Sequence, residues 1–426
     1  MDHFELKNGA LHAEDVPLET IAREVGTPVY VYSRATLTRH ARVFREALSA
    51  LPSVHIAFAV KSNPNLAVLH LLASEGYGAD VVSEGEMRRA LAAGIPAQDI
   101  VFSGVGKSKR ELKAAVEAGI GQFNLESEEE GVELAEIAAA LGRRASCALR
   151  VNPNVDARTH AKISTGKAEN KFGVAYDVAA GIYARLAELP GLLMRGLAVH
   201  IGSQISDLEP SRQAFIKMGA LMETIRAEGH EVTHMDLGGG LGVPYKVGES
   251  LPTPDDYGRM VHDVAKDWGV TLMFEPGRVI TGNSGVLVTE VIRVKQGASN
   301  PFVVVDAAMN DLARPAMYDA WHDFAAVNPT GETMVANIVG PICESSDTFA
   351  MGREIDAVRA GDFGVFRTAG AYGATMANTY NSRALVPEVM VDGEKWALVA
   401  NRIEPETILS AERVPEWLKQ EQDAAE

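Results

Sequence analysis

One lysine in this chain stands where an apolar segment gives way to a polar turn. Lys61 follows the apolar residues 55–60 and precedes the polar residues Ser62 and Asn63. A lysine at the end of a strand, partly removed from water, is expected to have a lowered amine pKa, as Schiff-base chemistry requires. Most lysines at such positions are solvated surface residues without a chemical role. The position becomes informative only together with the motifs that follow it.

Three consecutive glycines form a second candidate site. Gly238, Gly239 and Gly240 follow the apolar residues 233–237. Their backbone N–H groups can approach an anion closely, as a phosphate cradle requires, although a tight turn would use the same residues. The chain contains neither a P-loop nor a dinucleotide-binding fingerprint. A small phosphorylated cofactor is therefore expected in preference to a nucleotide.

A carboxylate at the end of another apolar segment completes the pattern. Glu275 begins the run Glu275-Pro276-Gly277-Arg278, and a Schiff-base lysine, a phosphate cradle and such a carboxylate together indicate pyridoxal 5′-phosphate (PLP). At about 4 Å from the pyridine nitrogen and an effective dielectric of about 20, the carboxylate attracts the ring charge by about 4 kcal/mol before desolvation, or roughly three pKa units. It would thus keep the ring protonated and electron-withdrawing. A salt bridge to Arg278 is the alternative role for Glu275.

His200 ends a further apolar segment, and Ser203 follows it closely. A histidine in this position is usually a core residue whose ring nitrogens are hydrogen-bonded. With PLP bound, an imidazole stacked on the ring face explains the position better, and Ser203 is close enough in sequence to contact the ring or the phosphate.

Short apolar strands and amphipathic helices alternate from about residue 33 to residue 282. The strands are expected at residues 55–60, 79–83, 100–103, 122–125, 146–152, 196–200, 233–237 and 271–275. The helices are expected at residues 33–51, 66–75, 84–93, 109–118, 128–141, 179–189, 212–228 and 255–268. Most of these helices end at a glycine, which is typical of a C-cap. Eight strand–helix units over about 250 residues are typical of a (β/α)₈ barrel.

A doubly wound open sheet is the alternative arrangement of these elements. In a barrel, the carboxyl ends of all strands form one face, which would gather Lys61, His200 and Glu275 around one site. An open sheet would scatter them. The loops after the seventh and eighth strands, which commonly bind phosphate in barrels, carry Gly239 and Gly277 here. These features favour the barrel.

The pattern changes after residue 282. Strands are expected at residues 285–294, 301–306, 333–339, 384–391 and 395–403, with a short helix at 314–324 and an acidic tail, helical or frayed, at 404–426. Residues 4–11 and 29–32 also have a strand pattern and are expected to join this second sheet. We therefore predict an α/β protein in two parts: a PLP-binding (β/α)₈ TIM barrel at residues 33–282, and a mostly β domain, sandwich-like or barrel-like, made of residues 1–32 and 283–426.

Composition narrows the classes of partner. The 426 residues carry a net charge of −17, which argues against nucleic acid and anionic membranes as partners. The two cysteines cannot form a disulfide framework, no apolar run is long enough to span a bilayer, and the first residues lack a signal-peptide pattern. We expect a cytoplasmic protein that acts on a small molecule and binds no metal.

The motifs together resemble those of the group IV (fold type III) PLP-dependent decarboxylases, whose barrel is like that of alanine racemase, and in particular the members that decarboxylate diaminopimelate. The matching segments run in order through nearly the whole chain, at residues 58–63, 152–155, 160–166, 171–173, 200–204, 236–242, 275–278, 314–320, 340–347, 370–373 and 380–383. The resemblance implies decarboxylation of meso-2,6-diaminopimelate to L-lysine and CO₂, the last step of lysine biosynthesis.

The resemblance also implies roles for individual residues. Lys61 would hold PLP as a Schiff base, His200 would stack on its ring, and Glu275 would pair with the pyridine nitrogen. The other residues implied around the cofactor are Ser203, Gly239, Gly240, Gly277, Arg278 and Tyr372. Those implied around the substrate are Arg278, Arg314 and Tyr318 at the distal carboxylate, Glu344 at the distal ammonium, and Tyr372.

Cys343 would be the proton donor at the carbon that loses CO₂, and in the resembling family it reaches in from the neighbouring subunit. A homodimer with shared active sites is therefore implied, with the mostly β domain supplying substrate and dimer contacts. Cys147, within an apolar strand, is expected to be a small buried residue without a chemical role. The segment 163–171 is expected to be a mobile loop.

Three alternatives remain at this level. Amino-acid racemisation would place an arginine against the pyridine nitrogen, and Glu275 argues against it. Decarboxylases of the same group that act on carboxynorspermidine, ornithine or arginine share the cofactor residues, but Arg314 and Tyr318 favour a substrate with a second carboxylate. A non-catalytic PLP-binding homologue would have no reason to combine Lys61 with Cys343.

Overall fold

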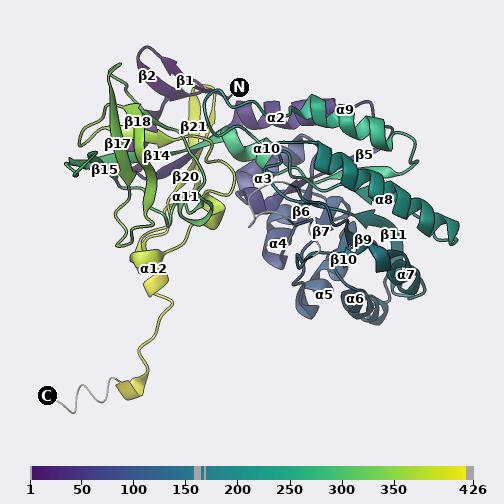
Figure 1. Ribbon diagram of the computed structural model, residues 1–426. Coiled ribbons are helices and arrows are strands. Elements are labelled where there is room, and N and C mark those ends of the chain that lie inside the picture. The colour runs from purple at the N-terminus through teal and green to yellow at the C-terminus, as the bar shows by residue number, and fades with distance from the viewer. Residues whose placement is uncertain (1, 158–164, 167–168, 419–426) are drawn as a thin grey trace.

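The computed structural model describes residues 2–157, 165–166 and 169–418. Residues 160–164 of the matched motifs lie outside these ranges, as do residues 163–164 and 167–168 of the segment expected to be a mobile loop. Figure 1 shows two bodies joined side by side, a mostly β body at the left and the barrel with its helices at the right.

Eight parallel strands close into the barrel: β5 (Val54–Ala59), β6 (Gly78–Val81), β7 (Ile100–Phe102), β8 (Gln122–Leu125), β9 (Ala145–Asn152), β11 (Leu192–Ala198), β12 (His234–Asp236) and β13 (Thr271–Phe274). The last strand pairs back onto the first, with Leu272 opposite Val54. The predicted barrel is therefore confirmed, and the open sheet is wrong. All eight predicted strands overlap the observed ones, and the short strand β10 (Val174–Ala175), which adds to β9, was not predicted.

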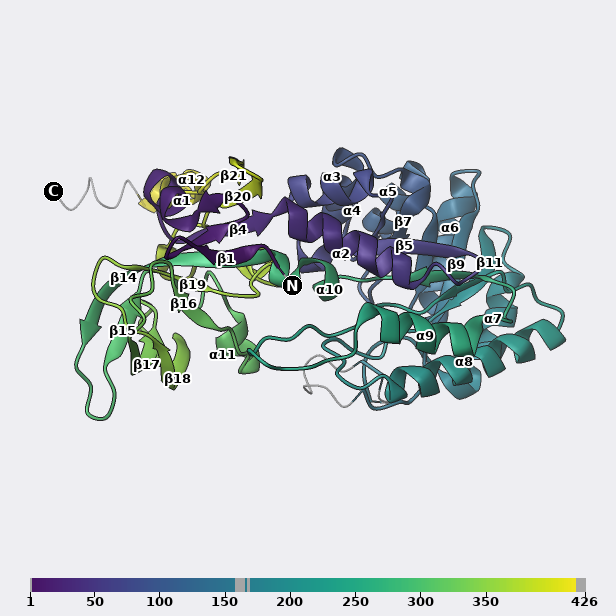
Figure 2. The same ribbon diagram turned by 90° about the horizontal axis from the view of Figure 1, so that it is seen from above.

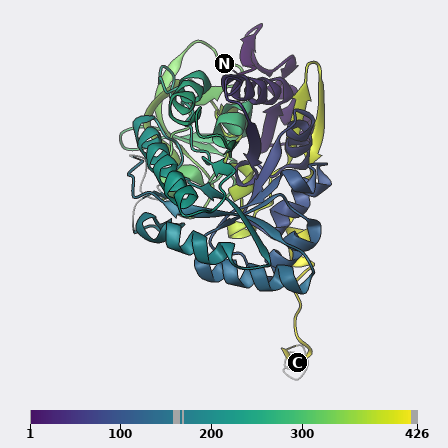
Figure 3. The same ribbon diagram turned by 90° about the vertical axis from the view of Figure 1, so that its right-hand side faces the viewer.

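The barrel strands are buried on both faces. Every residue of β6, β7 and β8 is buried, because side chains fill the interior and helices cover the outside. These helices are α2 (Arg34–Ala47), α3 (Leu66–Ser74), α4 (Glu84–Ala92), α5 (Lys109–Ala118), α6 (Glu128–Ala140), α7 (Tyr176–Ala187), α8 (Glu209–Ala227) and α9 (Pro254–Ala265). In Figure 3 the barrel faces the viewer and its helices lie around the outside.

Local sequence explains where several of these helices begin. The hydroxyls of Ser83, Ser108 and Ser127 each accept a hydrogen bond from the backbone N–H three residues later. Such N-caps satisfy a donor that has no partner within the helix, and each stabilises the helix by about 1 kcal/mol. Since each cap follows a barrel strand closely, it also sets the direction in which the chain leaves the carboxyl end of the barrel.

The second sheet has the strand order β18 (Thr348–Asp356), β17 (Thr333–Val339), β15 (Phe302–Val305), β14 (Gly285–Lys295), β4 (Val29–Ser33), β20 (Glu388–Asp392) and β21 (Lys395–Ala400), while β19 (Phe363–Phe366) joins β14 to β16 (Phe324–Ala326). As predicted, the segment 29–32 enters this sheet, with Val31 opposite Val286. In Figure 2 this mostly β part lies at the left of the barrel.

Two expectations about the mostly β part are wrong, and several of its strands were not predicted. The segment 4–11 does not join the second sheet: Asn8 and Gly9 have φ values of 52° and 83°, which reverse the chain, so β1 (Phe4–Lys7) pairs locally with β2 (Ala10–Ala13) and β3 (Val16–Pro17). The helix expected at 314–324 ends at Tyr318, because Asp319 takes a left-handed conformation with φ 52°. Strands β3, β16, β18 and β19 were not predicted.

Within the described ranges, no helix has both the length and the apolar character needed to cross a membrane. The tail after β21 contains the short helix α12 (Pro405–Leu409) and extends away from the rest of the protein (Figure 1).

Candidate functional site

Two adjoining cavities lie at the carboxyl ends of the barrel strands. The first, of about 190 Å³, is lined mainly by strand-end residues, and the second, of about 380 Å³, extends toward the mostly β part. Lys61, Thr165 and His200 line both cavities. The barrel therefore brings together residues far apart in the sequence, as predicted.

Lys61 pairs with a buried carboxylate that the sequence analysis missed. Its Nζ lies 2.6 Å from Oδ2 of Asp80, which is fully buried at the next strand of the barrel. Burial opposes the charge on Lys61, but the carboxylates of Asp80 and Glu275 outweigh it, so the amine pKa is raised above its usual value. The expected lowering of this pKa is therefore wrong for the cofactor-free chain, because strand-end position alone does not reveal the acidic neighbours.

Glu275 and Asp236 form a buried pair of carboxyl groups. The Asn124 side-chain amide donates to Oδ2 of Asp236 at 2.9 Å and to Oε1 of Glu275 at 3.3 Å. Burial, followed by the charges of Asp236 and Asp80, raises the pKa of the Glu275 carboxyl well above its usual range. Two carboxyl groups that are buried this close together are stabilised in their charged form by a nearby positive charge. A protonated ring nitrogen fits that requirement.

His200 is held as a neutral ring. The backbone N–H of Gly239 donates to Nδ1 at 3.2 Å, which leaves Nε2 as the protonated nitrogen. Burial, followed by the charges of Arg150 and Lys61, lowers the imidazole pKa well below its usual value. Thr165, which the sequence analysis did not single out, donates its hydroxyl to the His200 carbonyl at 2.7 Å. A neutral ring of fixed orientation is suited to stacking on an aromatic cofactor.

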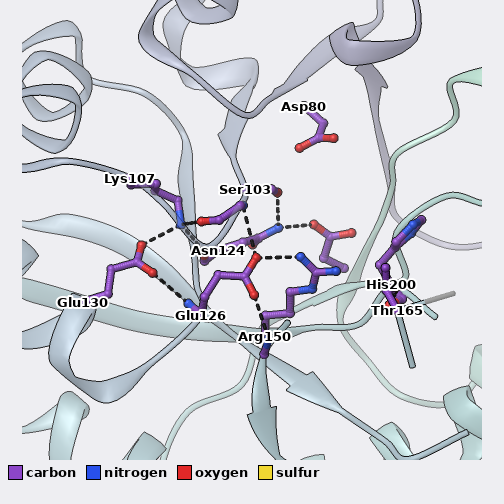
Figure 4. A network of polar contacts seen from close by, with 12 residues as sticks. Asp80, Ser103, Lys107, Asn124, Glu126, Glu130, Arg150, Thr165 and His200 are labelled. Atoms are coloured by element: carbon purple, nitrogen blue, oxygen red, sulfur yellow. Dashed lines mark hydrogen bonds and ion pairs between the residues drawn. The ribbon is translucent and has the colours of Figure 1, made fainter. Parts of the chain in front are cut away.

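A network of buried charges supports the wall of the first cavity (Figure 4). Arg150 donates to Glu126 at 2.6 Å, and Lys107 donates to Glu130 at 2.6 Å. The backbone N–H of Glu126 in turn donates to Glu130 at 3.0 Å. Because each charge has a partner, none is left buried and uncompensated, and the pairing with Glu126 fixes the position of Arg150 at the cavity wall. The signal that could have found these residues is their position at or just beyond the ends of β7, β8 and β9.

The glycine run after β12 packs too closely against neighbouring loops to carry side chains. A Cβ atom at Gly239 would lie 2.1 Å from the carbonyl oxygen of Glu275, and one at Gly240 would lie 2.4 Å from that of Gly202. A Cβ atom at Gly277, which precedes α10 (Arg278–Thr281), would lie 3.1 Å from side-chain atoms of Ala59 and Ser62. Such close backbone approach suits a phosphate group. With the amine and the carboxyl pair, the residues present fit PLP.

Two arginines, Arg278 and Arg314, line the second cavity. Arg278 donates to the Tyr245 hydroxyl at 2.6 Å and to Ser203 at 3.1 Å, while its buried Nε has no acceptor. Arg314 stacks on Tyr245, 4.5 Å from the ring centroid. In the part of the chain that the structure describes, neither guanidinium forms an ion pair with a carboxylate. The pair is therefore suited to an anionic group of a ligand.

The predicted residues Tyr318 and Tyr372 also line this second cavity. The Tyr372 ring centroid lies 4.8 Å from Cζ of Arg278, and its backbone N–H donates to the carbonyl of Ser62 at 2.8 Å. Tyr245, which the sequence analysis missed, follows the glycine run by a few residues and contacts both arginines.

Cys343 and Glu344 are exposed, and neither lines the cavities of its own chain. They lie in the loop between β17 and β18. Asp347 holds this loop by accepting hydrogen bonds from the backbone N–H groups of Ile342 at 2.6 Å and Met309 at 2.7 Å. Glu344 accepts hydrogen bonds from Tyr380 and Ser346. A single chain thus presents this pair outward and does not bring it to Lys61. Cys147, by contrast, is fully buried, as predicted.

Comparison with known proteins gives a consistent result. The family model described as "Pyridoxal-dependent decarboxylase, pyridoxal binding domain" matches residues 34–282. The diaminopimelate decarboxylase of Zymomonas mobilis is 51% identical over 418 residues, which cover 97% of this chain and 99% of that protein. The diaminopimelate decarboxylase of Vibrio cholerae is 46% identical, with 97% and 99% covered. The crystal structure of diaminopimelate decarboxylase from M. jannaschii in co-complex with L-lysine superposes with a TM-score of 0.93 at 35% identity, covering 97% of this chain and 98% of that one.

Proposed function

The chain belongs to the diaminopimelate decarboxylase family of pyridoxal-dependent enzymes, and from that membership we propose that its two adjoining cavities form one active site. The reaction is the PLP-dependent decarboxylation of meso-2,6-diaminopimelate to L-lysine and CO₂, the last step of lysine biosynthesis. One observation carries the placement of this substrate: beside Lys61 lie Arg278 and Arg314, which form no ion pair with any carboxylate among the described residues.

PLP bound in the first cavity supplies an electron sink, because its protonated pyridine ring takes up the electron pair left on the substrate when CO₂ departs. Lys61 would hold the cofactor covalently through Nζ at its aldehyde carbon, with release of water, and Glu275, with Asp236 beside it, would keep the ring nitrogen protonated. His200 packs on the ring face as a neutral imidazole. The residues proposed around the phosphate and ring are Ser203, Gly239, Gly240, Gly277, Arg278 and Tyr372.

The second cavity holds the far end of the substrate. Arg278 and Arg314, with the hydroxyl of Tyr318, bind the distal carboxylate, for which planar guanidinium groups supply two-pronged hydrogen bonds. Tyr372 closes the cavity on the side of Arg278. A substrate without this carboxylate would leave two buried positive charges unpaired, so the site selects against it.

Proton delivery to the substrate requires a second subunit. Because Cys343 and Glu344 are exposed on a loop held by Asp347, we place them in the active site of the neighbouring copy in a homodimer. There the Cys343 Sγ–H donates its proton to the carbon that has lost CO₂, and the Glu344 carboxylate binds the distal ammonium of the substrate. The exposed position of both residues in the single chain supports this assignment.

Two further expectations remain proposals. We divide the chain into a barrel at residues 33–282 and a mostly β domain at 1–32 and 283–426, which is supported by the strand pairings on either side of these bounds. We also place the protein in the cytoplasm, which is supported by its two unpaired cysteines, Cys147 and Cys343.

The direct test is the formation of lysine from meso-2,6-diaminopimelate by the purified protein with added PLP. L-lysine and CO₂ in equal amounts are expected, with no product from carboxynorspermidine, ornithine or arginine. Product from one of those three alone would move the enzyme to a different substrate within the same group. Bound PLP with no product from any of the four would indicate the non-catalytic alternative.

A further inference from the structure

His322, which lines neither cavity, contacts the arginine proposed to bind the substrate. It is almost fully buried, at 1% exposure. Its Nδ1 lies 2.9 Å from the carbonyl oxygen of Arg367, and its Nε2 lies 2.9 Å from Nη1 of Arg314. A carbonyl oxygen can only accept a hydrogen bond and a guanidinium can only donate. The two neighbours therefore select one tautomer, in which Nδ1 carries the hydrogen and Nε2 accepts from Arg314.

Tyr245 completes this support. Its ring packs edge-on against the His322 ring, with centroids 5.4 Å apart and planes at 84°. The Arg314 guanidinium lies over the same tyrosine ring, and the Tyr245 hydroxyl accepts from Arg278. Neutral acceptors thus hold both guanidinium groups. The reason is electrostatic: a carboxylate in place of His322 would neutralise Arg314 and compete with an anionic ligand, whereas a neutral imidazole orients the guanidinium and leaves its charge uncompensated.

The buried surroundings keep this ring neutral. Burial, followed by the charges of Arg314, Arg278 and Arg353, lowers the pKa of His322 to about 3, while the hydrogen bond to the Arg367 carbonyl opposes the shift. At neutral pH the Nε2 lone pair is therefore available to Arg314.

We propose that His322 is a positioning residue for substrate selection, whose Nε2 lone pair holds the Arg314 guanidinium in the orientation that receives the distal carboxylate of the substrate. This role rests on the proposed function of the second cavity. His322 does not touch the substrate, and it acts only through Arg314. Its removal should therefore weaken recognition of the distal carboxylate and leave the chemistry at the other end of the substrate in place.

The test is a matched pair of variants in the PLP-loaded protein. His322→Asn keeps a donor near the Nδ1 position and loses the acceptor for Arg314, whereas His322→Gln places an acceptor near the Nε2 position. For His322→Asn we expect KM for meso-2,6-diaminopimelate to rise about tenfold or more, since a hydrogen bond to a charged group is affected, with kcat changed by less than about threefold. His322→Gln should stay within about threefold of the wild-type KM.

Inhibition constants separate this role from a structural one. L-lysine keeps the distal carboxylate and lacks only the carboxyl group that is lost, so its inhibition constant should rise in His322→Asn together with KM, whereas that of 1,5-diaminopentane, which has no carboxylate, should be the same in the wild type and in His322→Asn. In a variant that already carries Arg314→Ala, the further change His322→Asn should not raise KM again, because His322 acts only through Arg314. An equal rise in the inhibition constant of 1,5-diaminopentane would overturn the proposal, as would a wild-type KM in His322→Asn.

Folding of each variant is checked by its thermal melt and by the absorbance of bound PLP. If His322→Asn does not fold, His322→Phe takes its place, because it keeps the ring and the contact to Tyr245 while losing the acceptor, and the same rise in KM is expected. Wild-type protein that forms no lysine would reject the proposed function. Active wild type with unaffected His322 variants would reject the role of His322 alone.

Discussion

At the scale of the residue, the first cavity contains buried acidic groups and an amine of opposite charge. Asp80, Asp236 and Glu275 are buried acids, and Lys61 is the cation that balances them when no cofactor is bound. At about 4 Å and an effective dielectric of about 20, each such pair interacts by about 4 kcal/mol. The carboxyl pair thus has a strong preference for a positive group, which the ring nitrogen of PLP supplies when protonated.

Replacing Glu275 tests that preference. In Glu275→Gln a neutral amide cannot hold the ring nitrogen in its protonated form, so we expect kcat to fall about 100-fold or more, the scale typical of losing one charge-stabilising group. Bound PLP, measured by its absorbance, should persist because Lys61 and the glycine cradle remain. Glu275→Asp, which keeps the charge, should retain more activity than Glu275→Gln. Equal activity of the two variants would contradict this role.

At the scale of the element, the ends of β12 and β13 build the cradle. The loops that follow them approach so closely that a Cβ atom at Gly239 would lie 2.1 Å from a carbonyl oxygen of the neighbouring loop. Backbone atoms cannot move aside as a flexible side chain can, so the loops must separate if this glycine is replaced. The cradle depends on the contact between two elements and not on the glycine run alone.

Gly239→Ala is therefore expected to weaken PLP binding. Separation of the loops should raise the Kd for PLP about tenfold or more and lower Tm, since forcing an extra carbon into a packed site costs about 1–3 kcal/mol. Fluorescence titration with PLP and a thermal melt measure the two effects. Gly106→Ala is the control, because a Cβ there would have no atom within 4 Å. Equal PLP affinity in the two variants would argue against the cradle.

At the scale of the whole molecule, one chain does not bring together all the residues of the proposed active site. Lys61 lies in the barrel, whereas Cys343 stands on an exposed loop of the mostly β part. A homodimer would complete both sites at once, and we expect its interface to bury more than about 2,000 Å², as in obligate dimers. The fold thus places the amine and the proton donor on different surfaces of the same chain.

Mixed dimers test the shared site. Lys61→Ala and Cys343→Ala should each be inactive, and a mixture of the two should recover about a quarter of wild-type activity, since half of the dimers are hybrids with one intact site each under random exchange. Activity is measured after subunit exchange has been verified with differently tagged copies. A mixture that contains hybrids and shows no activity would contradict the shared site.

Buried histidines make the cofactor-free protein sensitive to acid. Burial, followed by the charge of Arg195, lowers the pKa of His234 to about 4, below the value of about 6.5 in an unfolded chain. Between these two pH values the unfolded chain binds more protons than the folded one, so stability falls as pH falls through 6.5 toward 4. The contribution is absent above about pH 7.

The corresponding variant is His234→Gln, which has no proton to take up on unfolding. The Tm of this variant minus that of the wild type should be constant from pH 8.5 to 7. This difference should then increase as pH falls toward 4. Thermal melts over this range of pH measure it. A difference that does not change with pH would show that His234 is not held neutral.

Local sequence sufficed to predict most of the fold. Strands that are buried on both faces appear in the sequence as short apolar runs. The helices begin at serine caps and end at glycines, which are contacts within a few residues. The eight barrel strands and their helices could therefore be predicted. Motif spacing was enough to select Lys61, His200, Glu275 and the glycine run as site candidates, since each follows or ends a strand. The helix expected at 314–324 was wrong because the left-handed conformation of Asp319 leaves no clear pattern in the sequence.

Only the tertiary structure decided how these groups behave. Asp80, Asn124 and Thr165 belong to the site because barrel closure brings distant strand ends together. The pKa of Lys61 is raised, contrary to expectation, because its sign depends on distances to acids that lie far away in the sequence. The support of Arg314 by His322 and the outward position of Cys343 also follow from packing between elements. The chemistry that a residue can perform can be inferred from its type and its local spacing. Its charge state and its partners are set by contacts between residues far apart in the sequence.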